Sequence, residues 1–107
     1  MRKKPEIRAD VKKMAKVFKA LSNENRLELF IEIMKVHETC IETGTGECFI
    51  TDIMDSLNIG APTISHHMKE LSNAGLVITE RKGKFLVARI NDEVTGEIRE
   101  LFSSRER

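Results

Sequence analysis

Tryptophan and tyrosine are absent from this sequence of 107 residues, which also contains only two cysteines and two prolines. Two cysteines are too few for the disulfide framework that stabilises small secreted domains. No apolar run approaches the ~20 residues that a membrane-spanning helix requires. The start, Met1-Arg2-Lys3-Lys4-Pro5, is basic, but the apolar segment of a secretory signal does not follow it. We therefore expect a cytoplasmic protein that does not associate with a membrane.

The chain is expected to form one domain over residues 1–107, because its length suits a single hydrophobic core. Hydrophobic residues make up 40% of it and charged residues 33%, which is typical of a folded domain with a highly charged surface. Within this domain we expect residues 1–6 to form a basic arm and residues 103–107 to fray.

Positive and negative charges are separated along the sequence, although the net charge is only +1. Residues 1–19 contain eight basic and two acidic residues, whereas residues 20–62 contain two basic and eight acidic residues. Residues 63–89 are basic again, with five basic and two acidic residues. Basic surfaces attract polyanions such as nucleic acids, so the elements that hold these basic residues are candidates for such a surface.

Apolar residues recur at spacings of three and four near both ends of the sequence, which predicts two amphipathic helices. The first is expected from about Pro5 to Leu21, and the last begins with Asp92 as its cap. One core in so short a chain covers both apolar faces poorly, so we expect these helices to form a homodimer. The residues expected at the dimer interface are Ile7, Val11, Met14, Phe18, Val94, Ile98, Leu101 and Phe102.

A second helix is predicted from an N-cap at Ser22-Asn23 to about Val36. The apolar residues at helical spacing in this segment are Leu27, Phe30, Ile31 and Met34. Residues 37–48 lose the periodicity and contain two glycines, so we expect a loop there.

Two short helices separated by a turn are predicted over residues 50–73. The first opens at Ile50 or Thr51, and its apolar residues are Ile53, Met54 and Leu57. The turn is Asn58-Ile59-Gly60-Ala61, since Asn and Gly tolerate the left-handed backbone that ends a helix. The second helix begins near Pro62 and stops before Gly75, and its apolar face consists of Ile64, Met68 and Leu71.

Two β-prone runs follow, at residues 76–79 and 85–88, and a basic turn at residues 81–84 joins them. A helix-turn-helix followed directly by a basic hairpin is a winged helix. The expected fold is therefore mainly α with a β-hairpin wing, a winged helix-turn-helix that dimerises through its first and last helices.

The outward face of the second helix of this motif has the chemistry of a DNA-reading helix. Small hydroxyls and an imidazole near its start reach base edges in a major groove, and Lys69 reaches a phosphate. A basic wing tip meets a neighbouring phosphate backbone or a minor groove. The residues expected to contact DNA are Thr63, Ser65, His66, Lys69, Asn73, Arg81, Lys82 and Lys84.

Two other classes of function compete with DNA binding. Winged helices also serve as protein-interaction modules, and the basic residues of the wing argue against that alternative. A small thiol enzyme, with a cysteine nucleophile and a histidine base, is the less favoured alternative. The sequence has no glycine-rich phosphate loop and no Ser-His-Asp order, so we expect no enzymatic activity.

The sequence resembles the ArsR-type winged helix-turn-helix repressors of bacteria. KALSNENRL at residues 19–27 is similar to the second-helix signature of that family. APTISHHMKEL at residues 61–71, followed by AGLV at residues 74–77, is similar to its recognition helix, and RKGK at residues 81–84 to its wing. The resemblance implies a homodimeric repressor on a pseudo-palindromic double-stranded DNA operator. It also implies that the repressor leaves the operator when a small inducer, of unknown identity here, arrives.

The metal sites that the resemblance implies are not intact in this sequence. One family site places a Cys-x-Cys-Asp pattern on the third helix. Anchored on Asp52, the two cysteine positions hold Phe49 and Thr51, and Cys48 lies one place away. The other site uses Asp and His on the last helix, and no histidine occurs in residues 90–94 or after them. We therefore assign no metal site and no cofactor.

Cys40 and Cys48 lie at the two ends of the expected loop, and a loop of this length brings its ends together at a low entropic cost. If the two cysteines meet, they can form a disulfide, bridge a persulfide chain, or bind a thiophilic ion with His37, which makes these three residues candidates for a sensor. The alternative is that both cysteines are incidental small residues, with Cys48 packed beside Phe49. Neighbouring glutamates also disfavour the reactive thiolate.

Overall fold

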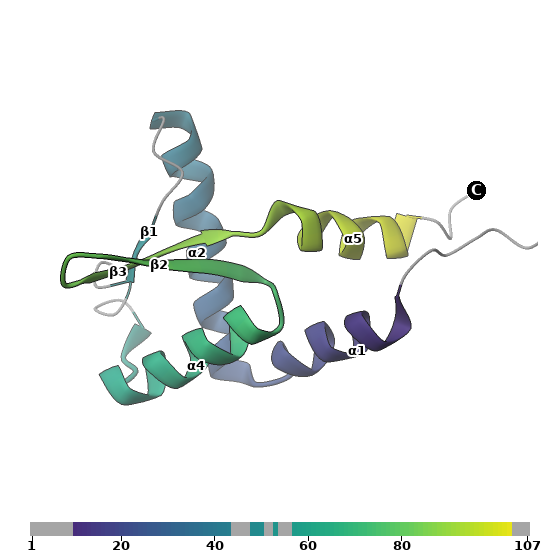
Figure 1. Cartoon of the computed structure of the whole chain (residues 1–107), viewed down its shortest axis with the longest axis horizontal. Coiled ribbons are helices and arrows are strands. Elements are labelled where there is room, and N and C mark those ends of the chain that lie inside the picture. The colour runs from purple at the N-terminus through teal and green to yellow at the C-terminus, as the bar shows by residue number, and fades with distance from the viewer. Residues whose placement is uncertain (1–9, 44–47, 51–52, 54–56, 104–107) are drawn as a thin grey trace, which may run out of the picture.

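The computed structural model describes residues 10–43, 48–50, 53 and 57–103, and in that part of the chain helices pack around a small antiparallel sheet (Figure 1). The β2–β3 hairpin extends to one side of the molecule, whereas α1 and α5 extend to the opposite side (Figure 1). The elements in chain order are α1 (Val11–Ala20), α2 (Glu24–Thr43), β1 (Cys48–Phe49), α4 (Ala61–Asn73), β2 (Val77–Lys82), β3 (Phe85–Ile90) and α5 (Asp92–Ser103).

The predicted hairpin is confirmed, and a further strand lies beside it. The strand order is β1-β3-β2, with Cys48 paired to Ala88 and Lys82 paired to Phe85. Gly83 opens the two-residue connection between β2 and β3 with a φ of +65°, a backbone conformation that suits glycine. The sequence did not indicate β1, because two residues are too few to show an alternating pattern. We call β2, β3 and their connection the wing.

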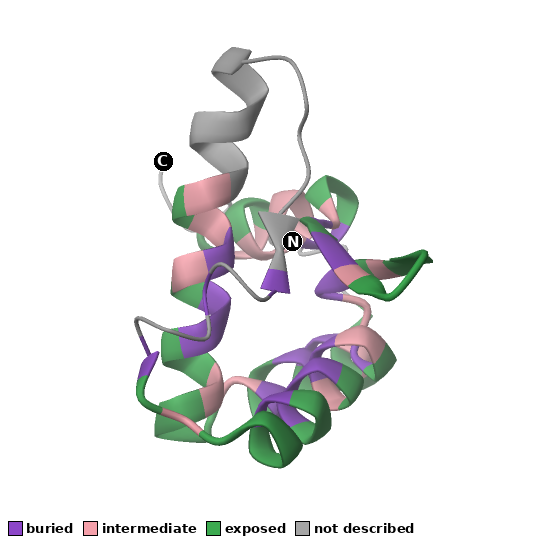
Figure 2. Ribbon diagram, turned by 90° about the vertical axis from the view of Figure 1, so that its left-hand side faces the viewer, coloured by how far each residue is buried: buried purple, intermediate pink, exposed green. Residues whose placement is uncertain are grey.

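The core lies between the helices and the sheet, on the inner faces coloured as buried in Figure 2. Leu29 and Ile33 of α2 are fully buried, whereas Leu27 and Ile31 are 39% and 37% exposed. The apolar spacing that indicated this helix therefore includes two residues, Leu27 and Ile31, that lie outside the core. Because α2 carries apolar residues around much of its circumference, their spacing does not single out the face that the core covers. None of the described helices is long and apolar enough to cross a membrane.

Helix α1 begins later than the apolar pattern predicted. Asp10 has an extended backbone and caps the helix, since its side chain accepts a hydrogen bond from Lys13 N at 3.2 Å. The helix therefore starts at Val11 and not at Pro5, which lies outside the described residues together with the expected basic arm.

Helix α2 begins as predicted and ends later. Asn23 Oδ1 accepts a hydrogen bond from Arg26 N at 3.0 Å, which confirms a cap at this position. The helix continues to Thr43, so the expectation of a loop from residue 37 was wrong. Loss of apolar periodicity does not stop a helix, and no glycine or proline occurs in this segment before Gly44.

Ile50, Ile53 and Leu57 are helical and buried, in keeping with the short helix expected before α4. Thr51 and Met54 lie outside the described residues.

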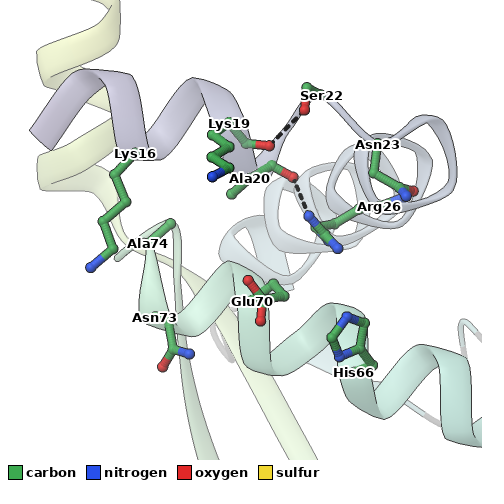
Figure 3. Close-up of a pocket in the computed structure, with 10 residues that line it drawn as sticks. All are labelled: Lys16, Lys19, Ala20, Ser22, Asn23, Arg26, His66, Glu70, Asn73 and Ala74. Carbon is green, nitrogen blue, oxygen red and sulfur yellow. Dashed lines mark hydrogen bonds between the residues drawn. The ribbon is translucent and has the colours of Figure 1, made fainter. Parts of the chain in front are cut away.

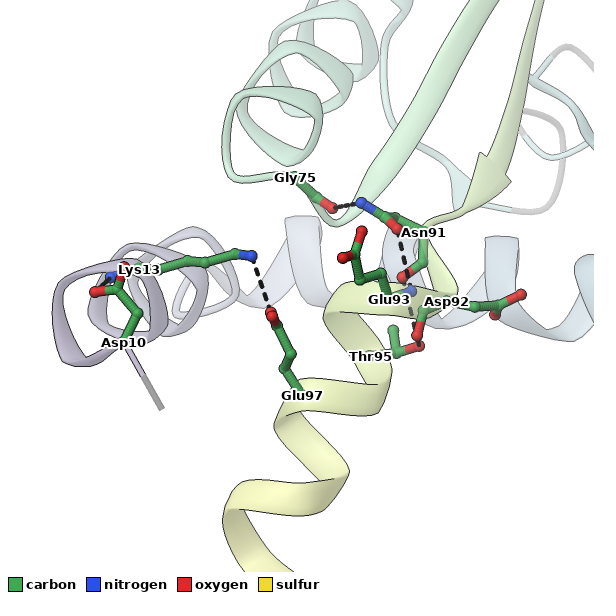
Figure 4. Close-up of polar contacts among 8 residues, drawn as sticks. All are labelled: Asp10, Lys13, Gly75, Asn91, Asp92, Glu93, Thr95 and Glu97. Atoms are coloured by element: carbon green, nitrogen blue, oxygen red, sulfur yellow. Dashed lines mark hydrogen bonds and ion pairs between the residues drawn. The ribbon is translucent and has the colours of Figure 1, made fainter. Parts of the chain in front are cut away.

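Both ends of α5 differ from the expectation by a residue. Glu93 N donates a hydrogen bond to Asn91 Oδ1 at 3.1 Å, so Asn91 caps the helix and Asp92 is its first residue (Figure 4). At the other end Ser103 is helical and its hydroxyl donates to Arg99 O at 2.7 Å. Ser103, the first of the residues expected to fray, is thus the last helical residue, and residues 104–107 lie outside the described part of the chain.

Candidate nucleic-acid interface

Helix α4 forms as the sequence predicted, and the residues at its two ends explain where it begins and where it stops. Asn58 has a φ of +51° in the turn before the helix, and Gly60 is the N-cap, with Pro62 in the first turn. Gly75 has a φ of +81°, which ends the helix and turns the chain into β2. The second helix of the expected helix-turn-helix and the wing are therefore present, and of the first helix the structure describes Ile50, Ile53 and Leu57.

One face of α4 is buried and the opposite face is exposed. Ile64, Met68 and Leu71 belong to the core, and His67 beside them is only 4% exposed. The five residues expected to point outward are all exposed, namely Thr63, Ser65, His66, Lys69 and Asn73. The helix therefore presents hydroxyls, an imidazole, an ammonium and an amide to solvent along one side.

The wing tip presents three basic side chains at one end of the molecule. Arg81, Lys82 and Lys84 are all exposed. Lys84 Nζ lies 5.8 Å from the centroid of the Phe85 ring, within the range of a cation–π contact.

Two grooves run along the two sides of α4. The first, which we call the wing groove, has a volume of about 290 Å³ and separates α4 from the wing. The second, which we call the junction groove, has a volume of about 650 Å³ and lies between α4 and the α1–α2 junction (Figure 3). Of the α4 residues, Ser65 and Lys69 line the wing groove, His66 and Glu70 line the junction groove, and Asn73 lines both.

Arg26 joins three helices through its guanidinium. Its Nε donates to Nδ1 of His67 in α4 at 3.3 Å, and its Nη1 donates to the carbonyl oxygen of Ala20, the last residue of α1, at 3.1 Å (Figure 3 draws the Ala20 bond). Burial lowers the pKa of His67 below its ordinary value, and the positive charges of Arg26 and His66 lower it further. His67 is thus a neutral side chain that holds α4 in place. Sequence reasoning gave Arg26 no role, since a single arginine carries no spacing signal.

Asn91 joins the end of α4 to the start of α5. Its Nδ2 donates to the carbonyl oxygen of Gly75 at 2.9 Å while its Oδ1 caps α5 (Figure 4). The backbone N–H of Asn91 also donates to Leu76 O at 3.0 Å. The sequence did not point to this residue, because only the fold brings Gly75 within its reach.

Helices α1 and α5 leave part of their apolar surface uncovered. Val11 is 79% exposed, Phe18 38% and Phe102 59%, and the rings of the two phenylalanines lie 6.2 Å apart. Ile98 and Leu101 are half-buried. We call these five residues the apolar face.

Two residues expected at the dimer interface lie elsewhere. Met14 and Val94 are 5% and 3% exposed, so they belong to the core of the protomer and not to a surface. The helical spacing of these residues does not distinguish an inner from an outer apolar position. Ile7 lies outside the described residues. Lys13 and Glu97 link the two helices by an ion pair of 3.0 Å, and Glu97 raises the pKa of Lys13 above its ordinary value (Figure 4).

The side chains of the candidate sensor residues His37, Cys40 and Cys48 lie outside the described part of the structure. Their backbones place His37 and Cys40 in α2 and Cys48 in β1. Cys40 is thus inside a helix and not at the end of a loop, which corrects the argument from loop closure. Among the described residues, no group of three or more His, Cys, Asp and Glu side chains is arranged to hold a metal ion.

Known bacterial regulators are similar to this chain in sequence. The family model of bacterial regulatory proteins of the arsR family matches residues 41–79. The chain is 32% identical over 83 residues to the arsenical resistance operon repressor of Bacillus subtilis, covering 78% of this chain and 70% of that repressor. It is 29% identical over 85 residues to the arsenic resistance transcriptional regulator ArsR2 of Pseudomonas putida, covering 79% of this chain but only 66% of that protein.

Solved structures share the fold. A crystal structure of an ArsR family transcriptional regulator superposes with a TM-score of 0.71 at 13% identity, covering 92% of this chain and 91% of that one. The homodimeric winged helix-turn-helix DNA-binding domain of a possible ArsR-family regulator from Mycobacterium bovis gives a TM-score of 0.60 at 22% identity. That comparison covers 91% of this chain and 88% of the other.

Proposed function

This chain belongs to the ArsR family of bacterial regulatory proteins and is a DNA-binding transcriptional regulator, and we propose that it is a homodimeric repressor released from its operator by an inducer. The single observation that supports the DNA-binding residues is that α4 has one buried face and one exposed face. Its apolar face and His67 are buried in the core, while its polar residues are exposed beside a basic wing.

We assign different roles to the helix and the wing. Thr63, Ser65 and His66 lie in the first half of α4 and read base edges in the major groove. Lys69 and Asn73, further along the helix, contact phosphates. The wing residues Arg81, Lys82 and Lys84 contact a phosphate backbone or a minor groove, and they add affinity without adding sequence preference.

The apolar face supports the dimer. Phe18 and Phe102 are large exposed side chains in contact, and a similar fold occurs as a homodimer in the Mycobacterium bovis domain. A two-fold dimer places two α4 helices in successive major grooves. The operator is then pseudo-palindromic, with half-sites ~34–36 Å apart or a multiple of that distance. Such a repressor meets its operator in the cytoplasm, where we place it.

The proposal also concerns the chemistry of the inducer and the residues that sense it. Relatives of this chain are named for resistance to arsenic and cadmium. We propose Cys40, Cys48 and His37 as the thiol or metal sensor of this chain. Cys48 pairs with Ala88 of the wing through β1, so a change at Cys48 has a direct route to the wing. A role as incidental side chains is the competing interpretation.

The other functions considered for this fold have less support. The relatives of the chain are named transcriptional repressors and regulators, which does not favour a protein-interaction module without DNA binding. The same names describe regulators and not enzymes.

Fluorescence anisotropy with the promoter of the chain's own operon tests the proposal, with a random duplex of equal length as the control. Specific binding is typically tighter than non-specific binding by about 10³-fold or more. We expect a preference of that order at moderate salt. Equal affinity for the two duplexes contradicts the repressor function.

A further inference from the structure

The junction groove is lined by cations on the side that faces α4. Lys16 and Lys19 come from α1, and Ser22 and Asn23 come from the turn that precedes α2 (Figure 3). Both lysines are exposed, and neither forms an ion pair within the described part of the structure. By contrast, Lys13 and Lys35 are paired with Glu97 and Glu32.

The charge and dipole of this groove favour an anion. Arg26 adds a third cation to its lining, and Glu70 is the one carboxylate among the lining residues that the structure describes. The amino end of α2 contributes the partial positive charge of a helix N-terminus. Glu70 belongs to α4 and the two lysines to α1, so the cations form the wall opposite the recognition helix.

The position of the groove identifies the anion. A helix inserted in a major groove has one phosphate strand on each of its sides, because the groove is only ~12 Å wide. The wing and its basic tip lie on one side of α4, across the wing groove that Lys69 and Arg81 line. The α1–α2 junction with Lys16 and Lys19 lies on the other side, across the junction groove.

We infer that the junction groove holds the DNA phosphate strand on the side of α4 opposite to the wing, with Lys16 and Lys19 as its phosphate contacts. This inference rests on the proposed insertion of α4 in the major groove. The DNA interface would then include basic residues from the segment of residues 1–19, in addition to the recognition helix and the wing.

The salt dependence of binding tests the inference. Each neutralised phosphate contributes about 0.9 to the slope of log K against log salt concentration on duplex DNA. A dimer carries each lysine twice, so the slope for Lys16→Ala or Lys19→Ala falls by about 1.8, and for the double variant by about 3.6. The loss is the same for operator and random duplex, because phosphates carry no sequence information.

Lys35→Ala is the matched control, since it removes one exposed cation from α2 at a site outside the groove. Its slope is expected to equal that of the unmodified protein. Lys16→Arg with Lys19→Arg keeps both charges and is expected to keep the slope. Thermal melting of each variant checks that the fold is intact.

The outcomes separate the inference from the proposed function. A double variant with an unchanged slope overturns the inference, even if the unmodified protein prefers its operator. Equal binding of operator and random duplex by the unmodified protein overturns the repressor function, while the slope on random duplex still tests the two lysines. A protein that binds neither duplex overturns both.

Discussion

Arg26 Nε donates a hydrogen bond to Nδ1 of His67 across 3.3 Å, although the two residues are 41 positions apart in the chain. An imidazole nitrogen that accepts a hydrogen bond is unprotonated, so the proton of the neutral ring is on Nε2. Nε2 is buried and has no partner among the described residues. Both facts oppose a second proton on His67, and they agree with its lowered pKa.

Stability is expected to fall in mild acid because of His67. Its pKa in the folded protein is below its ordinary value of 6.5, so the unfolded chain binds the proton more tightly. The stabilising contribution is complete above the unfolded pKa and is lost as the pH falls toward the folded pKa. Urea midpoints measured between pH 7.5 and pH 5 are expected to decline more steeply in the unmodified protein than in His67→Gln. The exposed His66, changed to Gln, is the control and is expected to keep most of the decline, because burial, the main cause of the lowered pKa of His67, is unchanged.

Replacing Asn91 by Ala is expected to destabilise the protein by about 2 kcal/mol, since the side chain both caps α5 and satisfies the carbonyl of Gly75. Asp92→Ala is the matched comparison, because Asp92 is the neighbour that the sequence favoured as the cap. It is expected to cost less, since Asp92 is already inside the first turn of α5 and does not accept the hydrogen bond that caps the helix. Urea denaturation at one protein concentration compares the two variants. A larger loss of stability in Asp92→Ala contradicts our assignment of the cap.

Ser65→Ala and His66→Ala are expected to reduce the preference for operator over random duplex, by about 1–3 kcal/mol for each base that the replaced side chain reads. Lys82→Ala and Lys84→Ala are expected to weaken binding to all duplexes alike and to reduce the salt slope. Anisotropy titrations at three salt concentrations separate the two effects. Wing variants that change sequence preference alone are incompatible with this division of roles.

Phe102→Asp is expected to raise the dimer dissociation constant at least a hundredfold. Each buried phenylalanine contributes ~1.5–3 kcal/mol, and the two-fold axis counts it twice. Sedimentation velocity at micromolar concentrations measures the change. Phe85→Asp is the control, because Phe85 is a similarly exposed phenylalanine on the wing, at 41%. If both variants remain dimeric, the interface lies elsewhere.

A double change of Cys40 and Cys48 to Ser tests the proposed sensor. The unmodified repressor is expected to leave its operator with one of four candidate inducers, namely arsenite, cadmium, persulfide or peroxide. The double variant is expected to remain bound under the same treatment and to bind DNA normally without it. Release that is unchanged by the double substitution shows that neither thiol senses the inducer.

The parts of the fold that the sequence predicted best are those fixed by local chemistry. The spacing of Ile64, Met68 and Leu71, with Pro62 before them and Gly75 after them, determines both ends and the buried face of α4. The charge and turn chemistry of the wing are equally local. The exposed polar residues of α4 follow directly from its buried ones, because a helix has only one remaining side.

The features that the sequence did not predict depend on contacts between distant segments. Apolar spacing identified the residues of α1 and α5 but not that Met14 and Val94 meet the core while Phe18 and Phe102 remain exposed. The bonds of Arg26 to His67 and of Asn91 to Gly75 exist only after the helices have packed. The junction groove likewise arises from residues on three helices, so no single segment reveals it.

The connection between the wing and α5 is a single residue, since β3 ends at Ile90 and α5 begins at Asp92. A helix advances by about 100° for each residue, so inserting or deleting one residue here would rotate the whole of α5 by that angle. Phe102 would then point away from Phe18. We therefore expect length changes to be tolerated poorly at this position. In the dimer that we propose, this short connection therefore helps to fix the spacing between the two DNA-reading helices.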